Sequence, residues 1–335
     1  MLRVQMKISR FFNRYNSSKK AILLTLVGFC LVPVQAQVIY DMVVIGNPGN
    51  SNDKTGFGGV AYTYQIGKYE VTIGQYTEFL NAVASESDPY GLWNSSMTIP
   101  NIQGIGRSGS SGNYSYSVMN TSSESDISSN NMPVTGVSWF SAARFANWMA
   151  NGQPNGNESA GTTENGAYTL NGKKSGTTVI RNTINPNTNA APTYYIPTEN
   201  EWYKAAFFNG RDYYVFATQH NTTPSNIIGD SSNAANFLSD ATTGYSVPQS
   251  MLYSSSQTYL TNVGTFINSI SYYGTFDQNG SVWEWTDMDG SVSYYRSIKG
   301  GAWTSTPPYL QSSYRLVTVP STISVNSGFR LAGSI

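Results

Sequence analysis

The chain has 335 residues, and its 19 basic and 19 acidic side chains give a formal net charge of zero. Charged residues make up only 11% of the sequence, which provides no basic surface of the kind that nucleic-acid-binding proteins carry. We therefore expect no nucleic-acid partner. The length suits one large domain or two small ones with a hydrophobic core. Abundant Tyr, Asn, Ser, Thr and Gly are typical of an extracytoplasmic protein.

The N-terminus has the parts of a secretory signal peptide. Basic residues precede an apolar run over residues 21–34, and Val34 and Ala36 place small side chains where signal peptidase cleaves. The run is 14 residues long, shorter than the roughly 20 that cross a bilayer. We predict a signal peptide over residues 1–36, cleaved near Ala36. The mature protein would be secreted or periplasmic, with no stable membrane span. An uncleaved N-terminal anchor is the alternative.

Cys30 is the only cysteine, and it lies inside that apolar run. A lipid-attachment site would need a small residue before the cysteine, whereas Phe29 is bulky. Cleavage near Ala36 leaves a mature protein without cysteine. This excludes disulfides, thiol nucleophiles and thiolate metal ligands together.

Residues 38–45 and 62–71 have the pattern of short strands, with a turn-rich loop between them. Thr72 then suits a helix N-cap, and Gln75 stands at the spacing of a capping box. Residues 85–130 are rich in Ser, Gly, Asn and Tyr, which predicts a long surface loop. The helix behind Thr72 has an apolar stripe that we expect in the core: Ile73, Tyr76, Phe79, Leu80 and Val83.

A second helix is expected behind Ser138, which suits an N-cap. Residues 152–193 then read as another polar excursion, rich in hairpins. The second helix has apolar residues that we expect on one face: Trp139, Ala142, Ala143, Ala146 and Met149.

A short strand at residues 194–197 precedes a second capping box, made by Thr198 and Glu201, and a short helix. From Phe208 on, short strands, turns and aromatic residues continue without a further helical period. We find no internal repeat and no linker after residue 36. The sequence therefore predicts one irregular, loop-rich α+β domain over residues 37–335.

Six short motifs occur in the order seen in formylglycine-generating enzymes. Each is weak alone, but together they make the chain resemble the sulfatase-modifying factor family over residues 40–335. The resemblance implies a variant of the C-type lectin fold. The motifs occupy residues 64–72, 133–139, 196–202, 279–285, 300–303 and 328–330.

The chemistry of the family does not follow from this resemblance. Its oxidases use copper held by two cysteines, and the matching positions fall near Ser305 and Leu310. A hydroxyl and an aliphatic side chain do not hold copper(I), which prefers soft thiolates, so we expect neither catalytic residues nor copper. The iron-dependent sulfoxide synthases of the family need several histidines, whereas His220 is the only one here.

The resemblance also implies structural calcium beside the tryptophan motif. Calcium takes hard oxygen ligands, which a glycine turn and one carboxylate can supply. The alternative is a turn in which Glu284 caps amides without metal. The positions that match the family's first site are Asn279, Gly280, Val282 and Glu284.

A second implied calcium site matches Asn236, Phe237 and Phe266, although Gly264 stands where the family has a carboxylate. The family's groove is implied at Trp303, Arg315 and Arg330. Tryptophans are more often core residues than ligand contacts, and Arg330 also suits a structural role.

Three functions stay open on this basis. The first is a secreted, non-catalytic module that binds a peptide or a glycan through polar and aromatic surface loops. The second is a formylglycine-generating-type oxidoreductase, or another metal-dependent enzyme, on the same scaffold. The third is a structural protein associated with the cell envelope.

Overall fold

Capping boxes begin two of the three α-helices in the described part of the chain. The first helix, α1 (Ile73–Val83), follows Thr72, whose hydroxyl accepts from the Gln75 amide at 3.2 Å. The Gln75 side chain accepts from the Thr72 amide at 2.9 Å. Two donors that the helix leaves free are thereby satisfied. Every residue of the expected apolar stripe is buried, so this prediction is confirmed.

The computed structural model describes residues 37–120, 128–229, 231–240, 242–288 and 291–335. The predicted signal peptide and its cleavage site lie outside these ranges. Residues 37–335 form one compact unit. No helix within the described ranges is long and apolar enough to cross a membrane.

The second helix, α2 (Trp139–Ala150), begins at Ser138, which accepts from the Ser141 amide at 3.1 Å. All five apolar residues expected on one face are buried, and so is every other residue of α2. Its polar side chains find partners inside the protein. Arg144 pairs with Glu164 at 2.6 Å, and Asn147 donates to the main chain of Thr163 and Tyr168.

The third helix, α3 (Glu199–Phe207), starts at the expected capping box of Thr198 and Glu201. The Glu201 amide donates to the Thr198 hydroxyl at 3.1 Å, and the Glu201 carboxylate accepts from the Thr198 amide at 2.7 Å. After α3 the described residues contain no further α-helix, only the 3₁₀ turn η4 (Pro307–Leu310). Both expectations are confirmed.

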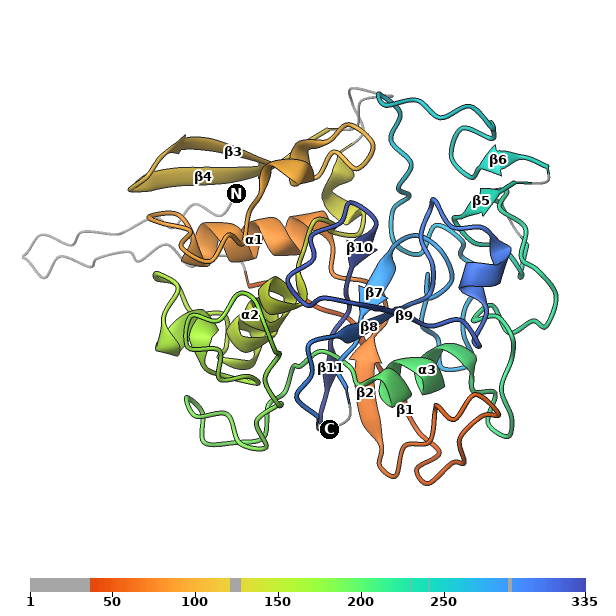
Figure 1. Cartoon of the computed structure of the whole chain (residues 1–335), viewed down its shortest axis with the longest axis horizontal. Coiled ribbons are helices and arrows are strands. Elements are labelled where there is room, and N and C mark those ends of the chain that lie inside the picture. Colours follow the sequence, from red (N-terminus) through yellow and green to blue (C-terminus); the bar gives the residue numbers. More distant parts are fainter. Residues whose placement is uncertain (1–36, 121–127, 230, 241, 289–290) are drawn as a thin grey trace, which may run out of the picture. The chain divides into compact units, whose positions relative to one another are not determined.

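Two small sheets form the centre of the unit, with α1 and α2 to their left in Figure 1 and α3 to their right. One has the order β1-β2-β11 and is antiparallel. The other has the order β10-β7-β8-β9, with β10 parallel to β7. The strands are β1 (Met42–Ile45), β2 (Tyr64–Gly67), β7 (Trp283–Trp285), β8 (Arg296–Lys299), β9 (Leu316–Thr318), β10 (Ser327–Gly328) and β11 (Ala332–Gly333).

The expected surface loop at residues 85–130 is wrong in part. It contains an antiparallel hairpin, β3 (Ile105–Ser110) with β4 (Asn113–Val118), beside α1 (Figure 1). Tyr116 fixes the hairpin there, because its hydroxyl donates to the carbonyl of Ala84 at 3.1 Å. The segment of β4 does alternate, with Tyr114, Tyr116 and Val118 between polar residues, but the high Ser, Gly and Asn content around it indicated a loop. Two 3₁₀ turns, η1 (Ser95–Thr98) and η2 (Ser129–Asn131), flank the hairpin.

Two other segments are less regular than expected, and one agrees with the short strands expected after Phe208. The strand predicted at residues 194–197 is a single bridge from Tyr195 to Ala332. The polar excursion at 152–193 contains one π-helical turn, η3 (Ala160–Glu164), and isolated bridges. A two-residue pair, β5 (Leu238–Ser239) with β6 (Gly244–Tyr245), lies in the loops before β7.

A buried ion pair joins these parts. Arg330, which is fully buried, donates to both carboxylate oxygens of Glu284 at 2.6 and 2.7 Å. It also donates to the carbonyl of Gly67 at 3.0 Å and to that of Phe276 at 2.8 Å. One side chain thus connects β2, β7 and the loop before β7. Trp202 of α3 donates to the same carboxylate at 2.8 Å.

Replacing Arg330 with Met should lower the free energy of unfolding by about 3–5 kcal/mol, because Glu284 would stay buried without its cation. Urea unfolding followed by circular dichroism measures the change. The double variant Arg330→Met, Glu284→Gln should recover part of the loss. Arg211→Met, at an exposed position, is the control. A loss below about 1 kcal/mol, the size typical of surface pairs, would contradict the role given to this pair.

Candidate functional site

The two positions that match the family's copper ligands lie close together. A Cβ placed on Gly301 would be 3.5 Å from Ser305 Cβ and 2.9 Å from Leu310 Cδ1. The Ser305 hydroxyl accepts from the Ala302 amide at 3.0 Å. Leu310 is fully buried and packs in an apolar cluster with Phe216. The two side chains are therefore engaged in turn formation and packing.

Trp303 is almost fully buried and stacks on Tyr259, with ring centroids 4.6 Å apart and planes 7° from parallel. Tyr253 also stacks on Tyr259, with ring centroids 5.7 Å apart, and is 56% exposed. Trp303 is therefore packed among aromatic rings.

Arg315 and Arg330 lie in different environments. Arg330 is in the interior, whereas one third of the Arg315 side chain is exposed. Arg315 pairs with Glu199 at 2.8 Å. The neighbouring Lys299 donates to the carbonyls of Ser312 and Tyr314 at 3.2 and 2.6 Å. Burial lowers the pKa of Lys299 to about 8.

The first calcium set does not fit a metal as arranged. Both carboxylate oxygens of Glu284 face Arg330, and Trp202 shares one of them. The side-chain oxygen of Asn279 accepts from the Ala217 amide at 2.7 Å. Gly280 and Val282 belong to the turn and strand that carry Glu284. A calcium ion here would have to share the Glu284 carboxylate with a buried arginine and a tryptophan.

The second calcium set fits a metal better, because a buried carboxylate lies beside it. Asp277 accepts from the Gly264 amide at 2.6 Å, so its carboxylate occupies the region where the family's carboxylate is missing. A cavity of about 10 Å³ is lined by Asp277, Phe266 and Asn279, about the size that holds one water. Burial raises the pKa of Asp277 to about 6.

The other residues of this set bind elsewhere. Asn236 donates from its side chain to Tyr259, and its carbonyl accepts from the Ser281 amide. The Phe237 carbonyl accepts from Asn226. Over the described ranges, no three Asp, Glu, His or Cys side chains converge as a metal site. A cation here would depend on main-chain oxygens and Asp277.

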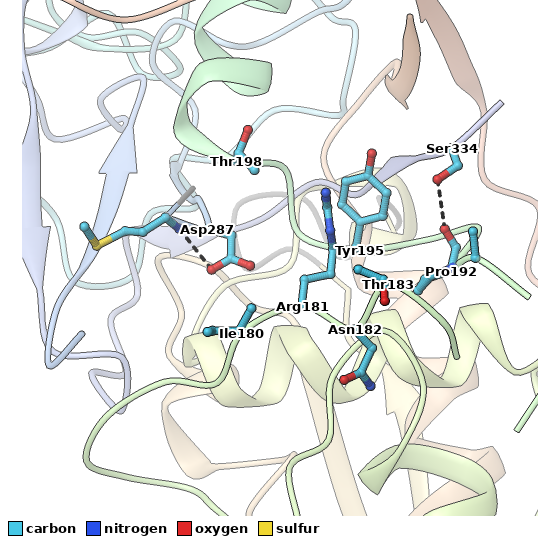
Figure 2. Close-up of a pocket in the computed structure, with 11 residues that line it drawn as sticks. Ile180, Arg181, Asn182, Thr183, Pro192, Tyr195, Thr198, Asp287 and Ser334 are labelled. Carbon is cyan, nitrogen blue, oxygen red and sulfur yellow. Dashed lines mark hydrogen bonds between the residues drawn. The ribbon is translucent and has the colours of Figure 1, made fainter. Parts of the chain in front are cut away.

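A pocket that the sequence did not predict opens beside Arg181, at the start of α3 (Figure 2). We call it the Arg181 pocket. It has a volume of about 360 Å³ and is lined by residues 180–183, 191, 192, 195, 198, 287, 288 and 334. A second cavity of about 300 Å³ shares Arg181 and Thr198 and continues toward Tyr62.

The guanidinium of Arg181 lies over the ring of Tyr195, 3.8 Å from its centroid. The nearest carboxylate is Glu201, whose Oε2 is 3.9 Å from Arg181 Nη1, too long for a hydrogen bond. Glu201 already accepts from Tyr62 and Tyr195 at 2.9 and 3.0 Å and from the Thr198 amide. Arg181 Nη1 is buried without a hydrogen-bond partner, and 29% of the side chain is exposed.

The facing wall contains Asp287, which is almost fully buried. Its carboxylate pairs with Arg296 at 2.9 Å and accepts from Tyr168 at 3.0 Å and from the Met288 amide at 3.0 Å. Burial raises the pKa of Asp287 to about 6. The hydrogen-bonding capacity of Asp287 is thus taken up by its own partners, whereas Arg181 keeps one unused donor group.

Sequence reasoning missed this pocket for a physical reason. Arg181 is the only basic residue between Lys174 and Lys204, which was the one local signal. Its neighbours Tyr195, Asp287 and Ser334 come from separate parts of the chain, and only the tertiary fold brings them together (Figure 2). Trp303, Arg315 and Arg330 line none of the cavities described here.

A sequence profile described as "Sulfatase-modifying factor enzyme 1-like domain" matches residues 58–335. No curated protein sequence matches the chain.

Among solved structures, CarF aligns at 19% identity and a TM-score of 0.47, covering 89% of this chain and 99% of CarF. Treponema denticola variable protein 1 aligns at 17% identity and a TM-score of 0.48, covering 90% and 100%. PvdO from Pseudomonas aeruginosa aligns at 17% identity and a TM-score of 0.44, covering 88% and 92%.

Lys299 should titrate near pH 8 rather than near the 10.4 of a free lysine, because it is buried beside Arg315. Its folded pKa lies below its unfolded value, so stability should fall as the pH drops from about 10.4 through 8. Glu199→Gln should lower the pKa further by removing an attractive charge. NMR titration of the lysine ε-carbons measures it, with the exposed Glu86→Gln as control. Titration of Lys299 near pH 10 would contradict this account.

Proposed function

The chain belongs to the sulfatase-modifying factor enzyme 1-like family, and from this premise we propose that it is a secreted binding module without the family's oxidase activity. Its loop-rich α+β architecture is the C-type-lectin-like variant of the formylglycine-generating enzyme fold. The observation that carries the proposal concerns Ser305 and Leu310, near the positions where the oxidases hold copper. The Ser305 hydroxyl accepts from an amide of a turn, and Leu310 packs in an apolar cluster.

The missing thiols matter because copper(I) prefers soft sulfur ligands. The only cysteine of the sequence, Cys30, lies in the predicted signal peptide. A serine hydroxyl that accepts from an amide and a leucine inside an apolar cluster offer no replacement. The scaffold is therefore kept without the group that carries the oxidation.

A binding role is supported by the Arg181 pocket. Its volume of about 360 Å³ lies in the range of small-molecule sites, which combine apolar walls with a few placed polar groups. The pocket places a partly exposed arginine against a tyrosine ring, with hydroxyl and amide side chains around them. We propose that a peptide or glycan is the class of partner.

The protein should form no aldehyde on a cysteine-containing sulfatase peptide, with or without added copper, because it lacks a thiolate pair. Mass spectrometry of the peptide detects the product, and a catalytically active formylglycine-generating enzyme is the positive control. Glycan and peptide arrays, probed with the same preparation, should give a selective signal. Aldehyde formation would overturn the proposal, as would silence on both arrays.

We further propose that structural calcium binds at the cavity beside Phe266, with Asp277 supplying the carboxylate. The support is the contact between Asp277 and the Gly264 amide and a cavity of single-atom size. Calcium takes carboxylate and carbonyl oxygens in flexible geometry. When bound, the ion would hold together the loops that carry Phe266 and Asn279.

Added calcium should raise the thermal unfolding midpoint, because a ligand that binds only the folded state stabilises it, by about 2.7 kcal/mol at a hundred times its dissociation constant. Asp277→Asn keeps an acceptor for the Gly264 amide but removes the charge, so the stabilisation should disappear. Asp212→Asn, at an exposed position, should leave it unchanged. A calcium effect that survives in Asp277→Asn would place the ion elsewhere, and no effect in the unaltered protein would refute the site.

A further inference from the structure

We propose that the Arg181 pocket binds the carboxylate of an acidic sugar, with Arg181 as its cationic contact. The inference rests on the proposed binding function and assigns a ligand chemistry to one pocket. A uronic acid ring, with one carboxylate and several hydroxyl groups, is the ligand class. The following observations lead to this choice.

Arg181 has hydrogen-bonding capacity that the protein does not use. Its nearest carboxylate, Glu201, is 3.9 Å away, too far for a hydrogen bond, and accepts instead from two tyrosine hydroxyls and an amide. Arg181 Nη1 is left without a hydrogen-bond partner. Surface arginines usually turn toward water, whereas Arg181 borders two adjoining cavities. An anion that enters the pocket would meet a guanidinium with capacity left for it.

The guanidinium is held ready for a ligand. It lies over the Tyr195 ring at 3.8 Å, a cation–π contact that fixes its plane. Tyr195 is held in turn by its hydroxyl, which donates to Glu201 at 3.0 Å, and by main-chain pairing with Ala332. Because these contacts exist without a ligand, binding needs little further ordering of side chains.

A planar carboxylate suits Arg181 because the guanidinium fork can donate two parallel hydrogen bonds to it. The remaining walls favour a sugar over a hydrophobic ligand. Asn182, Thr183, Thr198 and Ser334 offer amide and hydroxyl groups, while Ala191 and Pro192 are small and apolar. The volume of about 360 Å³ suits a single ring with its substituents.

The opposite wall does not repel such a ligand strongly. Asp287 faces the pocket, but its carboxylate is paired with Arg296 and accepts from Tyr168 and an amide. Its exposure is 3%. Of the charged groups at the pocket, only Arg181 has a donor left for a ligand's carboxylate.

Titration calorimetry or saturation-transfer NMR with sodium glucuronate on the purified protein tests the assignment, with glucose as the neutral comparison. Glucuronate should bind, and glucose should bind at least about tenfold more weakly, since a hydrogen-bonded charge is worth about 1.5–3 kcal/mol. Arg181→Met should weaken glucuronate binding by a similar factor. Arg181→Lys should retain part of the affinity, because lysine keeps the charge but lacks the fork.

Arg211→Met, exposed and outside the pocket, is the matched control and should bind as the unaltered protein does. Unfolding midpoints show that each variant is folded. Equal binding of glucose and glucuronate would overturn the assignment, as would unchanged affinity in Arg181→Met. Binding of a short peptide through its terminal carboxylate, with no binding of glucuronate, would also overturn it.

The outcomes separate this inference from the proposed function. An array signal that survives in Arg181→Met would refute the pocket and leave the binding module standing. Aldehyde formation on a sulfatase peptide would refute the module, whatever the pocket binds. Loss of both the array signal and glucuronate binding in Arg181→Met alone would support the two together.

Discussion

The buried pair of Arg330 and Glu284 is the interaction on which the rest of the structure depends. Glu284 belongs to β7 and Arg330 follows the paired strand β10, and their hydrogen bonds reach β2, α3 and the loop before β7. Burying an ion pair does not by itself add stability, since desolvation offsets the attraction. Its effect is on geometry, because the guanidinium fixes how the Glu284 carboxylate and the carbonyls of Gly67 and Phe276 meet around it. A second carboxylate, Glu70, lies 3.8 Å from Arg330 without a hydrogen bond, and burial raises its pKa well above the usual range.

Much of the fold could be predicted where the determining interactions are local. A capping box joins residues three positions apart, so Thr72 with Gln75 and Thr198 with Glu201 located two helices correctly. The hairpin at residues 105–118 could not be predicted in this way. Its strands are rich in Gly, Ser, Asn and Tyr, and its pairing depends on contacts such as Tyr116 with Ala84, which are distant in sequence. The complete burial of α2 was also beyond local reasoning, because the partner of Arg144, Glu164, lies 20 residues further along the chain.

The candidate sites divide along the same line. Counting from the Gly300–Gly301 turn located Ser305 and Leu310, because spacing within one loop is a sequence property. The prediction that Glu284 is a calcium ligand did not take into account its pairing with Arg330, which lies 46 residues further along the chain. Asp277 was overlooked for a similar reason. Its carboxylate is recognised as a candidate ligand only through its contact with the Gly264 amide, 13 residues earlier in the chain. The Arg181 pocket combines segments from the middle and the end of the sequence, and nothing in any one of them indicates the others.

The pairing of β11 with β2 has a consequence for how the protein comes to be folded. Arg330 lies 46 residues after Glu284 and 263 residues after Gly67, both of which it binds. Without β11, β2 keeps only β1 as a strand partner, and without Arg330, Glu284 keeps only Trp202. Contacts of such long sequence separation slow folding. The first sheet and the ion pair are therefore complete only after segments from both ends of this unit have met.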